Sequence, residues 1–173
     1  DLNLCTKRLT IRSFEAKDIT ETYVSWLNDP IVTRYSNQRF REHSIDECVL
    51  YAKSFVGSEN KFLAIIHRES NEMIGTMTIY QAKPHGTADI GIMIGNRNYW
   101  GLGLGSEAWI AVMRKLLERP EIRKVTGGTS RANKGMMKVM KQAGMHQEAV
   151  RKDQEIIEGE PTDIVYFAIF RQE

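Results

Sequence analysis

One passage constrains the fold more than any other, because a strand, a glycine-rich loop and an amphipathic helix follow one another directly. Residues 88–95 (ADIGIMIG) form an apolar run typical of a buried strand, and residues 99–108 (YWGLGLGSEA) contain three glycines at alternate positions. Apolar side chains then recur at helical spacing as far as Leu117. Glycines let a backbone turn tightly and direct consecutive N–H groups outward, and a helix N-terminus adds its positive dipole end. The passage predicts a site for a phosphorylated cofactor, with a plain glycine-rich turn as the alternative.

The sequence of the loop argues against two common phosphate-binding motifs. A Walker loop needs Lys-Ser or Lys-Thr after its last glycine, whereas Gly105 is followed by Ser106 and Glu107. A dinucleotide-binding fingerprint has the spacing G-x-G-x-x-G and an acidic residue closing the next strand. Here the spacing is G-x-G-x-G, and the next strand, residues 123–126, runs into two glycines without a carboxylate. A dinucleotide cofactor is therefore not expected.

Length and composition predict a single domain over residues 1–173 and exclude several classes of function. A net charge of +2 gives no electrostatic case for a nucleic-acid partner or a membrane partner. Cys5 and Cys48 are too few for a disulfide framework, and no apolar run reaches the length of a signal segment or a membrane span, so we expect a cytoplasmic protein. The histidines lack the spacing of a zinc site, so no metal is expected: His43, His67, His85 and His146.

The remaining sequence alternates strand-like and helix-like segments without a long linker. Helix starts are predicted at Asp18, at Ser44 with Glu47 as a capping box, and at Asn133, and Gly144 is the predicted end of the last helix. Strands are predicted at residues 4–14, 62–66, 73–80, 88–95, 123–126, 145–152 and 163–170. This order predicts an α+β fold: a mixed, largely antiparallel sheet of about seven strands, with helices on both faces.

The order of the predicted strands and helices, together with the motifs, resembles the GNAT superfamily of acetyl-coenzyme A-dependent N-acetyltransferases. The resemblance covers almost the whole chain. It is carried by residues 8–12 (RLTIR), 26–30 (WLNDP) and 99–108, and by Asn133 followed by residues 144–145. These look like the branch that contains ribosomal-protein N-terminal acetyltransferases and many small-amine acetyltransferases. The family loop is usually written Gln/Arg-x-x-Gly-x-Gly/Ala, so Trp100 takes its first position here.

The resemblance implies acetyl-coenzyme A as cofactor and a set of residues that hold it. Backbone amides of the loop would bind the pyrophosphate, and the strand at Ile92 and Ile94 would pair with the pantetheine arm like an added strand. Asn133 would hydrogen-bond the pantetheine, and a helix N-cap is the alternative role for this side chain. The loop residues implied are Trp100, Leu102, Gly103, Leu104, Gly105 and Ser106.

The implied chemistry is direct attack of a primary amine on the thioester, which needs a base for the ammonium and an acid for the departing thiolate. Many relatives place a tyrosine acid at the position of Met140, which cannot donate a proton, so Tyr166 is the candidate substitute or solvent supplies the proton. The alternative role for a strand tyrosine is a core residue with a satisfied hydroxyl. Asp89 is the leading candidate base, with a solvated strand-end residue as the alternative. His85 ranks second on its intrinsic pKa, although a loop histidine is more often plain surface.

Acceptor identity depends on residues 34–43, which line the acceptor side in GNAT proteins. Arg34, Tyr35, Arg39 and Phe40 combine guanidinium groups with aromatic rings, which suits a nucleotide-linked amino sugar, whereas a polar surface loop is the alternative. The first hypothesis is therefore a small-molecule N-acetyltransferase with a pocket walled by these residues. The second is a protein N-terminal acetyltransferase with an open, acidic groove, and the third is a noncatalytic acyl-coenzyme A-binding module. Homodimers are typical of the family.

Overall fold

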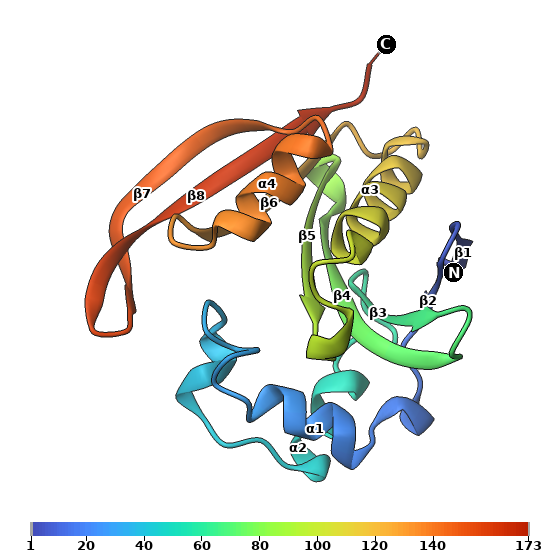
Figure 1. Cartoon of the computed structure of the whole chain (residues 1–173). Helices are drawn as coiled ribbons and strands as arrows, with labels where there is room; N and C mark the ends of the chain where they lie inside the picture. The colour runs from blue at the N-terminus through green and yellow to red at the C-terminus, as the bar shows by residue number, and fades with distance from the viewer. Residues whose placement is uncertain (1, 173) are drawn as a thin grey trace.

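Eight strands form one continuous sheet within residues 2–172, which the computed structural model describes (Figure 1). Their order is β1-β2-β3-β4-β5-β6-β8-β7, and β5 and β6 form the parallel pair in an otherwise antiparallel arrangement. The mixed α+β architecture predicted from the sequence is confirmed. The strands are β1 (Leu4–Cys5), β2 (Leu9–Ser13), β3 (Lys61–His67), β4 (Glu72–Ala82), β5 (Thr87–Ile94), β6 (Lys124–Ser130), β7 (His146–Ile157) and β8 (Glu160–Phe170).

The sheet has one strand more than predicted because the first expected strand folds back on itself. The backbone N–H of Thr6 donates to the carbonyl of Leu9 at 2.8 Å, and the Thr6 hydroxyl accepts from the N–H of Leu9 at 3.0 Å. This turn separates β1 from β2 and makes them an antiparallel pair. The alternating pattern of residues 4–14 fits both strands, so it did not reveal the reversal between them.

Helices cover both faces of the sheet, as predicted, and each pair builds its own core. α3 (Leu104–Leu117) and α4 (Lys134–Gln142) lie on one face, and α1 (Glu21–Leu27) and α2 (Ile45–Lys53) lie on the other (Figure 1). Trp109 and Phe167 are among the largest buried side chains under α3 and α4, whereas Tyr23, Trp26 and Phe62 form the core under α1 and α2. No helix in residues 2–172 is long and apolar enough to cross a membrane.

Two of the three predicted helix starts are confirmed. Ser44 and Glu47 form the capping box of α2, and the Asn133 side chain accepts from the N–H of Met136 at 3.1 Å. The prediction for Asp18 was wrong: Thr20 caps α1, and the Asp18 carboxylate instead binds the Arg12 guanidinium at 2.7 and 2.9 Å. Asp18 ends a short 3₁₀ turn, Ala16–Asp18, and its carboxylate also accepts from the backbone N–H of Glu15 at 2.8 Å.

Strands β5 and β6 are paired only at their starts, and their divergence creates the opening on which the site is built. Thr87–Asp89 pair in parallel with Lys124–Thr126, after which β6 continues along β8 and β5 continues along β4. Residues 90–94 therefore have a hydrogen-bonded neighbour on one edge only. An open strand edge inside a sheet is a template for an extended ligand.

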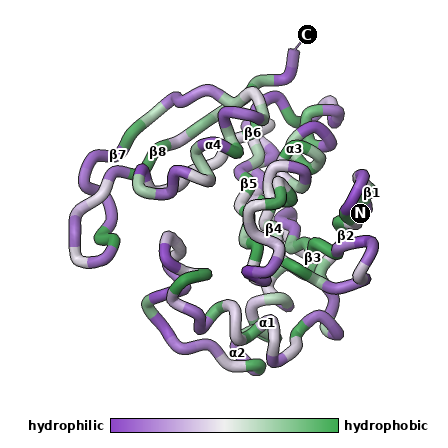
Figure 2. Tube along the Cα trace, in the orientation of Figure 1, coloured by the Kyte–Doolittle hydropathy of each residue, from purple (hydrophilic) through white to green (hydrophobic). Residues whose placement is uncertain are grey.

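The β7–β8 hairpin extends beyond the body of the sheet and returns toward the segment that follows α1 (Figure 1). Its outer strand, β7, exposes nearly all of its side chains, and Figure 2 shows this strand to be mainly hydrophilic. At the hairpin turn, Glu158 forms an ion pair with Arg34, with 2.7 Å between Oε1 and Nε. The hairpin thus holds residues 34–39 over the face of the sheet that carries α1 and α2.

Candidate active site

The glycine loop combines left-handed backbone with a series of free amides at the start of α3. Gly101 and Gly103 have φ angles of 75° and 77°, a conformation that glycine adopts at little cost. Trp100 donates its N–H to Arg97 and Glu107 donates its N–H to Gly103, whereas the amides from Gly101 to Ser106 have no protein partner within residues 2–172. Unpartnered amides at the positive end of a helix dipole have the chemistry that an anion-binding site needs. The residues predicted to hold the pyrophosphate are thus brought together.

An acidic side chain that the sequence interpretation overlooked anchors this loop to the N-terminal strands. The Glu107 carboxylate accepts from the Thr6 hydroxyl at 2.6 Å and from the backbone N–H and Nε of Arg8, each at 2.9 Å. Arg8 also donates to the carbonyl of Leu102 at 2.8 Å. Burial alone would raise the pKa of the Glu107 carboxyl, but the hydrogen bonds from Thr6 and Arg8 outweigh it and hold the pKa below its usual range. Glu107 is therefore a charged strut for the loop.

Trp100 fixes the other end of the loop on the open edge of β5. Its indole Nε1 donates to the carbonyl of Ile94 at 2.7 Å, so this carbonyl is already occupied. Alternate residues of a strand present their backbone groups to the same edge, so Ile92 offers its N–H and carbonyl beside Ile94. Of the two residues expected to pair with pantetheine, Ile92 thus keeps both groups available on that edge.

Asp89 lies where β5 and β6 separate, on the face of the sheet that α1 and α2 cover. Its register partners are Tyr80 on β4 and Thr126 on β6, and the Thr126 hydroxyl donates to Oδ2 at 2.7 Å. The residue keeps an exposed surface, while the flanking strands crowd the carboxyl group itself. This desolvation raises the pKa of the Asp89 carboxyl, and the hydrogen bond from Thr126 opposes the rise. A carboxylate with a raised pKa is a stronger base than one in water.

Tyr166 shares this face of the sheet. It pairs with Gly128 in the β6–β8 register, and its ring lies over that glycine, where an added Cβ would come within 2.9 Å of the ring. Its hydroxyl has no hydrogen-bond partner within residues 2–172, unlike a core tyrosine with a satisfied hydroxyl. Met140, at the position where relatives often place a tyrosine, is fully buried against Trp109 and Gly127. Tyr166 thus has an unpartnered hydroxyl, and it lies on the part of β8 that pairs with β6 beyond the divergence from β5.

His85 is not brought to this region. It lies in the 3₁₀ turn Lys83–His85, before the start of β5 and at the opposite end of that strand from the glycine loop. Its side chain is exposed, and its carbonyl accepts from Arg123 Nε at 2.7 Å. The geometry gives His85 no part in a site at the strand opening.

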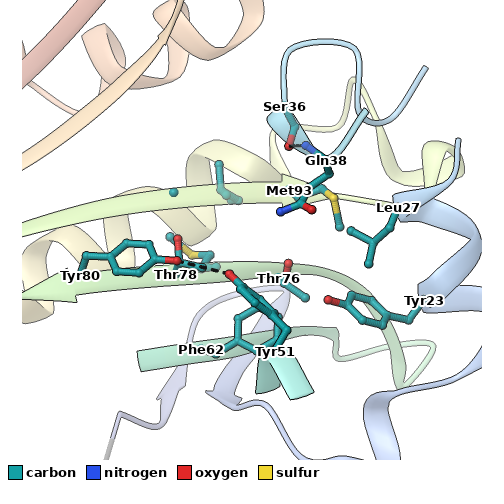
Figure 3. A pocket seen from close by; sticks show the side chains of 13 residues that line it. Tyr23, Leu27, Ser36, Gln38, Tyr51, Phe62, Thr76, Thr78, Tyr80 and Met93 are labelled. Atoms are coloured by element: carbon teal, nitrogen blue, oxygen red, sulfur yellow. Dashed lines mark hydrogen bonds between the residues drawn. The ribbon is translucent and has the colours of Figure 1, made fainter. Parts of the chain in front are cut away.

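A cavity of about 250 Å³ opens beside the strand divergence, between the sheet and α1 and α2. Figure 3 shows its wall, with the Tyr23 hydroxyl directed toward the strand that carries Thr76. On the α2 side, the hydroxyls of Tyr51 and Tyr80 lie 3.3 Å apart. None of the described residues that line it carries a formal charge. They are Tyr23, Leu27, Ser36, Gln38, Tyr51, Phe62, Thr76, Met77, Thr78, Tyr80, Gly91, Ile92 and Met93.

The residues predicted to wall the acceptor pocket do not line this cavity, and Arg39 instead lines a second cavity together with Leu27, Asn28 and Arg41. Arg34 binds Glu158, and Arg39 donates to the carbonyls of Ser36 and Ile156, each at 2.7 Å. Tyr35 and Phe40 lie beside these two arginines, with guanidinium-to-ring distances of 5.2 and 4.1 Å. The same segment does reach the cavity, but through neighbours that are neutral and polar, Ser36 and Gln38. The guanidinium groups were already committed to structural partners, which the sequence does not reveal.

Comparison with known proteins agrees with this geometry. The model of the acetyltransferase (GNAT) domain matches residues 8–146. The chain belongs to the GNAT acetyltransferase family. This GNAT protein is 29% identical over 175 residues to the uncharacterised N-acetyltransferase p20 of Bacillus licheniformis, covering 98% of this chain and 97% of that protein.

Solved structures share the fold over nearly the full length of the GNAT protein. A GNAT-family acetyltransferase from Bacillus anthracis superimposes with a TM-score of 0.84 at 23% identity, covering 99% of this chain and 100% of the other. Spermidine N-acetyltransferase from Vibrio cholerae, solved with coenzyme A and spermine, also has a TM-score of 0.84, at 16% identity, with 96% and 97% of the two chains covered.

Proposed function

We propose that this GNAT protein transfers the acetyl group of acetyl-coenzyme A to a primary amine of a small molecule. The observation that carries the proposal is the dual role of residues 91–93. On one side they border the open edge of β5, and on the other side they form a wall of the neutral cavity. A pantetheine arm lying along that edge would bring its thioester next to an amine held in the cavity. Such proximity is a large part of the catalysis of a two-substrate reaction.

The cofactor would be held mainly by backbone groups. The amides of Gly101–Ser106 would receive the pyrophosphate, with Arg8 close enough to add positive charge, since its guanidinium lies beside Gly103. Ile92 would pair with the pantetheine. Asn133 uses its side-chain oxygen to cap α4, and its amide N–H₂ has no protein partner within residues 2–172 and would be free to donate to the pantetheine.

Asp89 would take a proton from the attacking ammonium, directly or through one water molecule. The cost depends on the amine: at neutral pH, deprotonating a lysine-like amine of pKa ~10.4 costs about 4.6 kcal/mol, and an amine of pKa ~8 costs about 1.4 kcal/mol. The raised pKa of Asp89 reduces the difference in pKa between the ammonium and the carboxylate that would accept its proton. Tyr166 would donate a proton to the thiolate, which needs little help because a free thiol has a pKa near ~8.5.

The protein N-terminal alternative expects an open, acidic groove. None of the described residues lining the cavity is acidic, and residues 36–38 cover one side of it. This geometry favours a small acceptor over a protein terminus.

The test is a thiol-release assay with acetyl-coenzyme A and a panel of small amines, amino-sugar nucleotides and N-terminal peptides, with cofactor binding measured by calorimetry in parallel. We expect cofactor binding and turnover restricted to small amines. Turnover of peptides alone would refute the acceptor class. Binding without turnover of any amine, including at high pH, would support the noncatalytic alternative.

A further inference from the structure

Two largely buried residues of the cavity wall carry hydroxyl groups that lack a protein partner within residues 2–172. Tyr23 and Thr76 are only 3% and 6% exposed, and neither side-chain oxygen has a hydrogen-bond partner within residues 2–172. No side-chain nitrogen or oxygen in that part of the chain is both fully enclosed and unpartnered, so these two oxygens open onto the cavity. Polar groups this deep in a protein are normally hydrogen-bonded, and an open site is the place where a ligand would bind them.

The hydroxyl groups of Tyr23 and Thr76 are uncharged, like the other side chains of the cavity wall. Burial raises the pKa of both Tyr23 and Tyr51, so these phenols stay protonated at physiological pH. Gln38 adds a carboxamide, and Thr78 adds a further hydroxyl. Aromatic faces complete the wall, with the rings of Tyr51 and Phe62 5.2 Å apart at 78°. The wall can donate and accept hydrogen bonds and can contact apolar surface, but it contains no charged side chain that could form an ion pair.

We infer that the acceptor is a compact amine whose only charge is the reacting ammonium, carried on a neutral body with a hydroxyl or amide group. This inference rests on the proposed function and narrows it to a class of substrate. The reacting ammonium would lie toward Asp89, and the neutral body would lie between Tyr23, Thr76 and the aromatic rings. A second ammonium or a phosphate would be desolvated in the cavity without an ion-pair partner, which is unfavourable.

The size of the cavity agrees with this assignment. A volume of about 250 Å³ is below the range of roughly 300–1,000 Å³ typical of sites for drug-sized ligands. A nucleotide-linked sugar is larger than that and carries phosphates. The arginines that would have recognised phosphate bind Glu158 and backbone carbonyls instead.

The test uses pairs of amines that differ by one charged group: 5-aminopentan-1-ol against 1,5-diaminopentane, glucosamine against glucosamine 6-phosphate, and tyramine against tyrosine. Each is titrated calorimetrically into the enzyme with coenzyme A bound, and each is assayed for acetylation. We expect the member with a neutral body to bind at least about 10-fold more tightly in each pair that binds. Tighter binding of the charged members, or no binding of any pair, would overturn the inference.

Calorimetry separates this inference from the proposed function. Neutral-bodied amines that bind but are not acetylated would support the inference and refute the proposed reaction. Acetylation confined to charged amines would support the reaction and refute the inference.

Variants locate the interaction. Tyr23→Phe and Thr76→Val each remove one hydroxyl at nearly constant shape, and each should raise the KM of the preferred amine about 3- to 10-fold. The KM of acetyl-coenzyme A should not change. Tyr99→Phe is the matched control, because the Tyr99 hydroxyl binds Ser70 and Glu72 away from the cavity. An effect of Tyr99→Phe equal to that of Tyr23→Phe would contradict the assignment.

A gain of function provides the sharper test. Gln38→Glu adds a carboxylate to the wall, and it is made together with Arg41→Gln because Arg41 Nη2 lies 3.4 Å from the Gln38 side-chain oxygen. Compared with Arg41→Gln alone, the double variant should shift preference toward 1,5-diaminopentane by at least about 5-fold. Unchanged selectivity in a double variant with a native circular dichroism spectrum would overturn the assignment of this cavity as the acceptor site.

Discussion

Replacing Thr126 by valine should raise the pKa of Asp89 and move the pH dependence of catalysis with it. In the native protein, the Thr126 hydroxyl donates to Asp89 Oδ2 at 2.7 Å and stabilises the ionised carboxyl, while desolvation destabilises it. Thr126→Val removes the stabilising contact and keeps the branched shape of a β-strand residue. In the variant, desolvation is no longer opposed by this hydrogen bond, so the pKa of Asp89 rises and less of it is ionised at any given pH.

The size of the shift follows from the strength of that hydrogen bond. Hydrogen bonds to charged groups contribute roughly 1.5–3 kcal/mol. Asp89 keeps an exposed surface, so water replaces part of the lost bond and about 1 kcal/mol is expected. At about 1.36 kcal/mol per pKa unit, the shift is about 0.7 unit upward. The acidic limb of the kcat/KM profile, which reports the free enzyme, should move by the same amount.

Two measurements check this prediction independently. Carbon NMR titration of the Asp89 carboxyl gives its pKa without reference to activity, and steady-state kinetics between about pH 5 and 9 give the acidic limb. Thr162→Val, which removes a hydroxyl near the start of β8, is the control and should leave both unchanged. A shifted NMR pKa with an unmoved acidic limb would refute Asp89 as the base, and an unmoved NMR pKa would refute the hydrogen-bond argument.

Three further outcomes are expected. Gly103→Val should weaken acetyl-coenzyme A binding by at least about 10-fold in calorimetry, because a branched side chain blocks the loop. Gly57→Val carries similar strain at a φ of 74° with no atom within 4 Å, and equal weakening there would refute the loop as the cofactor site. Tyr166→Phe should lower kcat about 10-fold at neutral pH and progressively less at higher pH, with the KM of acetyl-coenzyme A unchanged; a pH-independent loss would argue against proton donation. Glu107→Gln should lower the free energy of urea unfolding by about 2 kcal/mol at pH 7. The pKa of Glu107 is lowered in the folded protein, so its contribution to stability is full above the unfolded pKa near ~4.3 and is lost as the pH falls through the folded pKa. The stability of the variant should therefore approach that of the native protein near pH 3. An equal loss of stability at both pH values would contradict the charged-strut role.

Local chemistry made much of the fold predictable. Helical spacing and the capping signals at Ser44 and Asn133 located α2 and α4, and the glycines at alternate positions located the loop before α3. The prediction of Asp18 as a helix cap was wrong because its carboxylate binds Arg12 on β2, a tertiary contact that the local sequence does not show. The reversal between β1 and β2 was missed because the alternation of the two short strands reads as a single one.

The cofactor side of the site was more predictable than the acceptor side, for a physical reason. In the proposed site, backbone amides would bind the cofactor, so the necessary glycines appear as a contiguous motif. The cavity proposed for the acceptor is instead assembled from α1, α2, β3, β4, β5 and the segment that follows α1, which are brought together only by tertiary packing. Arg34 and Arg39 were predicted as substrate-binding residues because of their charge. In the structure they bind the β7–β8 hairpin instead, Arg34 through the Glu158 carboxylate and Arg39 through the Ile156 carbonyl.

One signal of the cavity is nevertheless present in the sequence of β4. Thr76, Thr78 and Tyr80 are polar and occupy alternate positions, whereas Ile74, Met77 and Ile79 are fully buried apolar neighbours. β4 lies inside a sheet that carries helices on both faces, and Thr76 is buried on the face of α1 and α2, so little solvent reaches this part of the stripe, although Tyr80 at its end is exposed. Either helices must hydrogen-bond the stripe or a cavity must lie over it. α2 contributes Tyr51, whose hydroxyl bonds that of Tyr80, whereas the hydroxyls of Thr76 and Thr78 have no partner within residues 2–172 and line the cavity. A polar stripe on an interior strand, opposite an aromatic helix face, therefore predicts a neutral binding cavity.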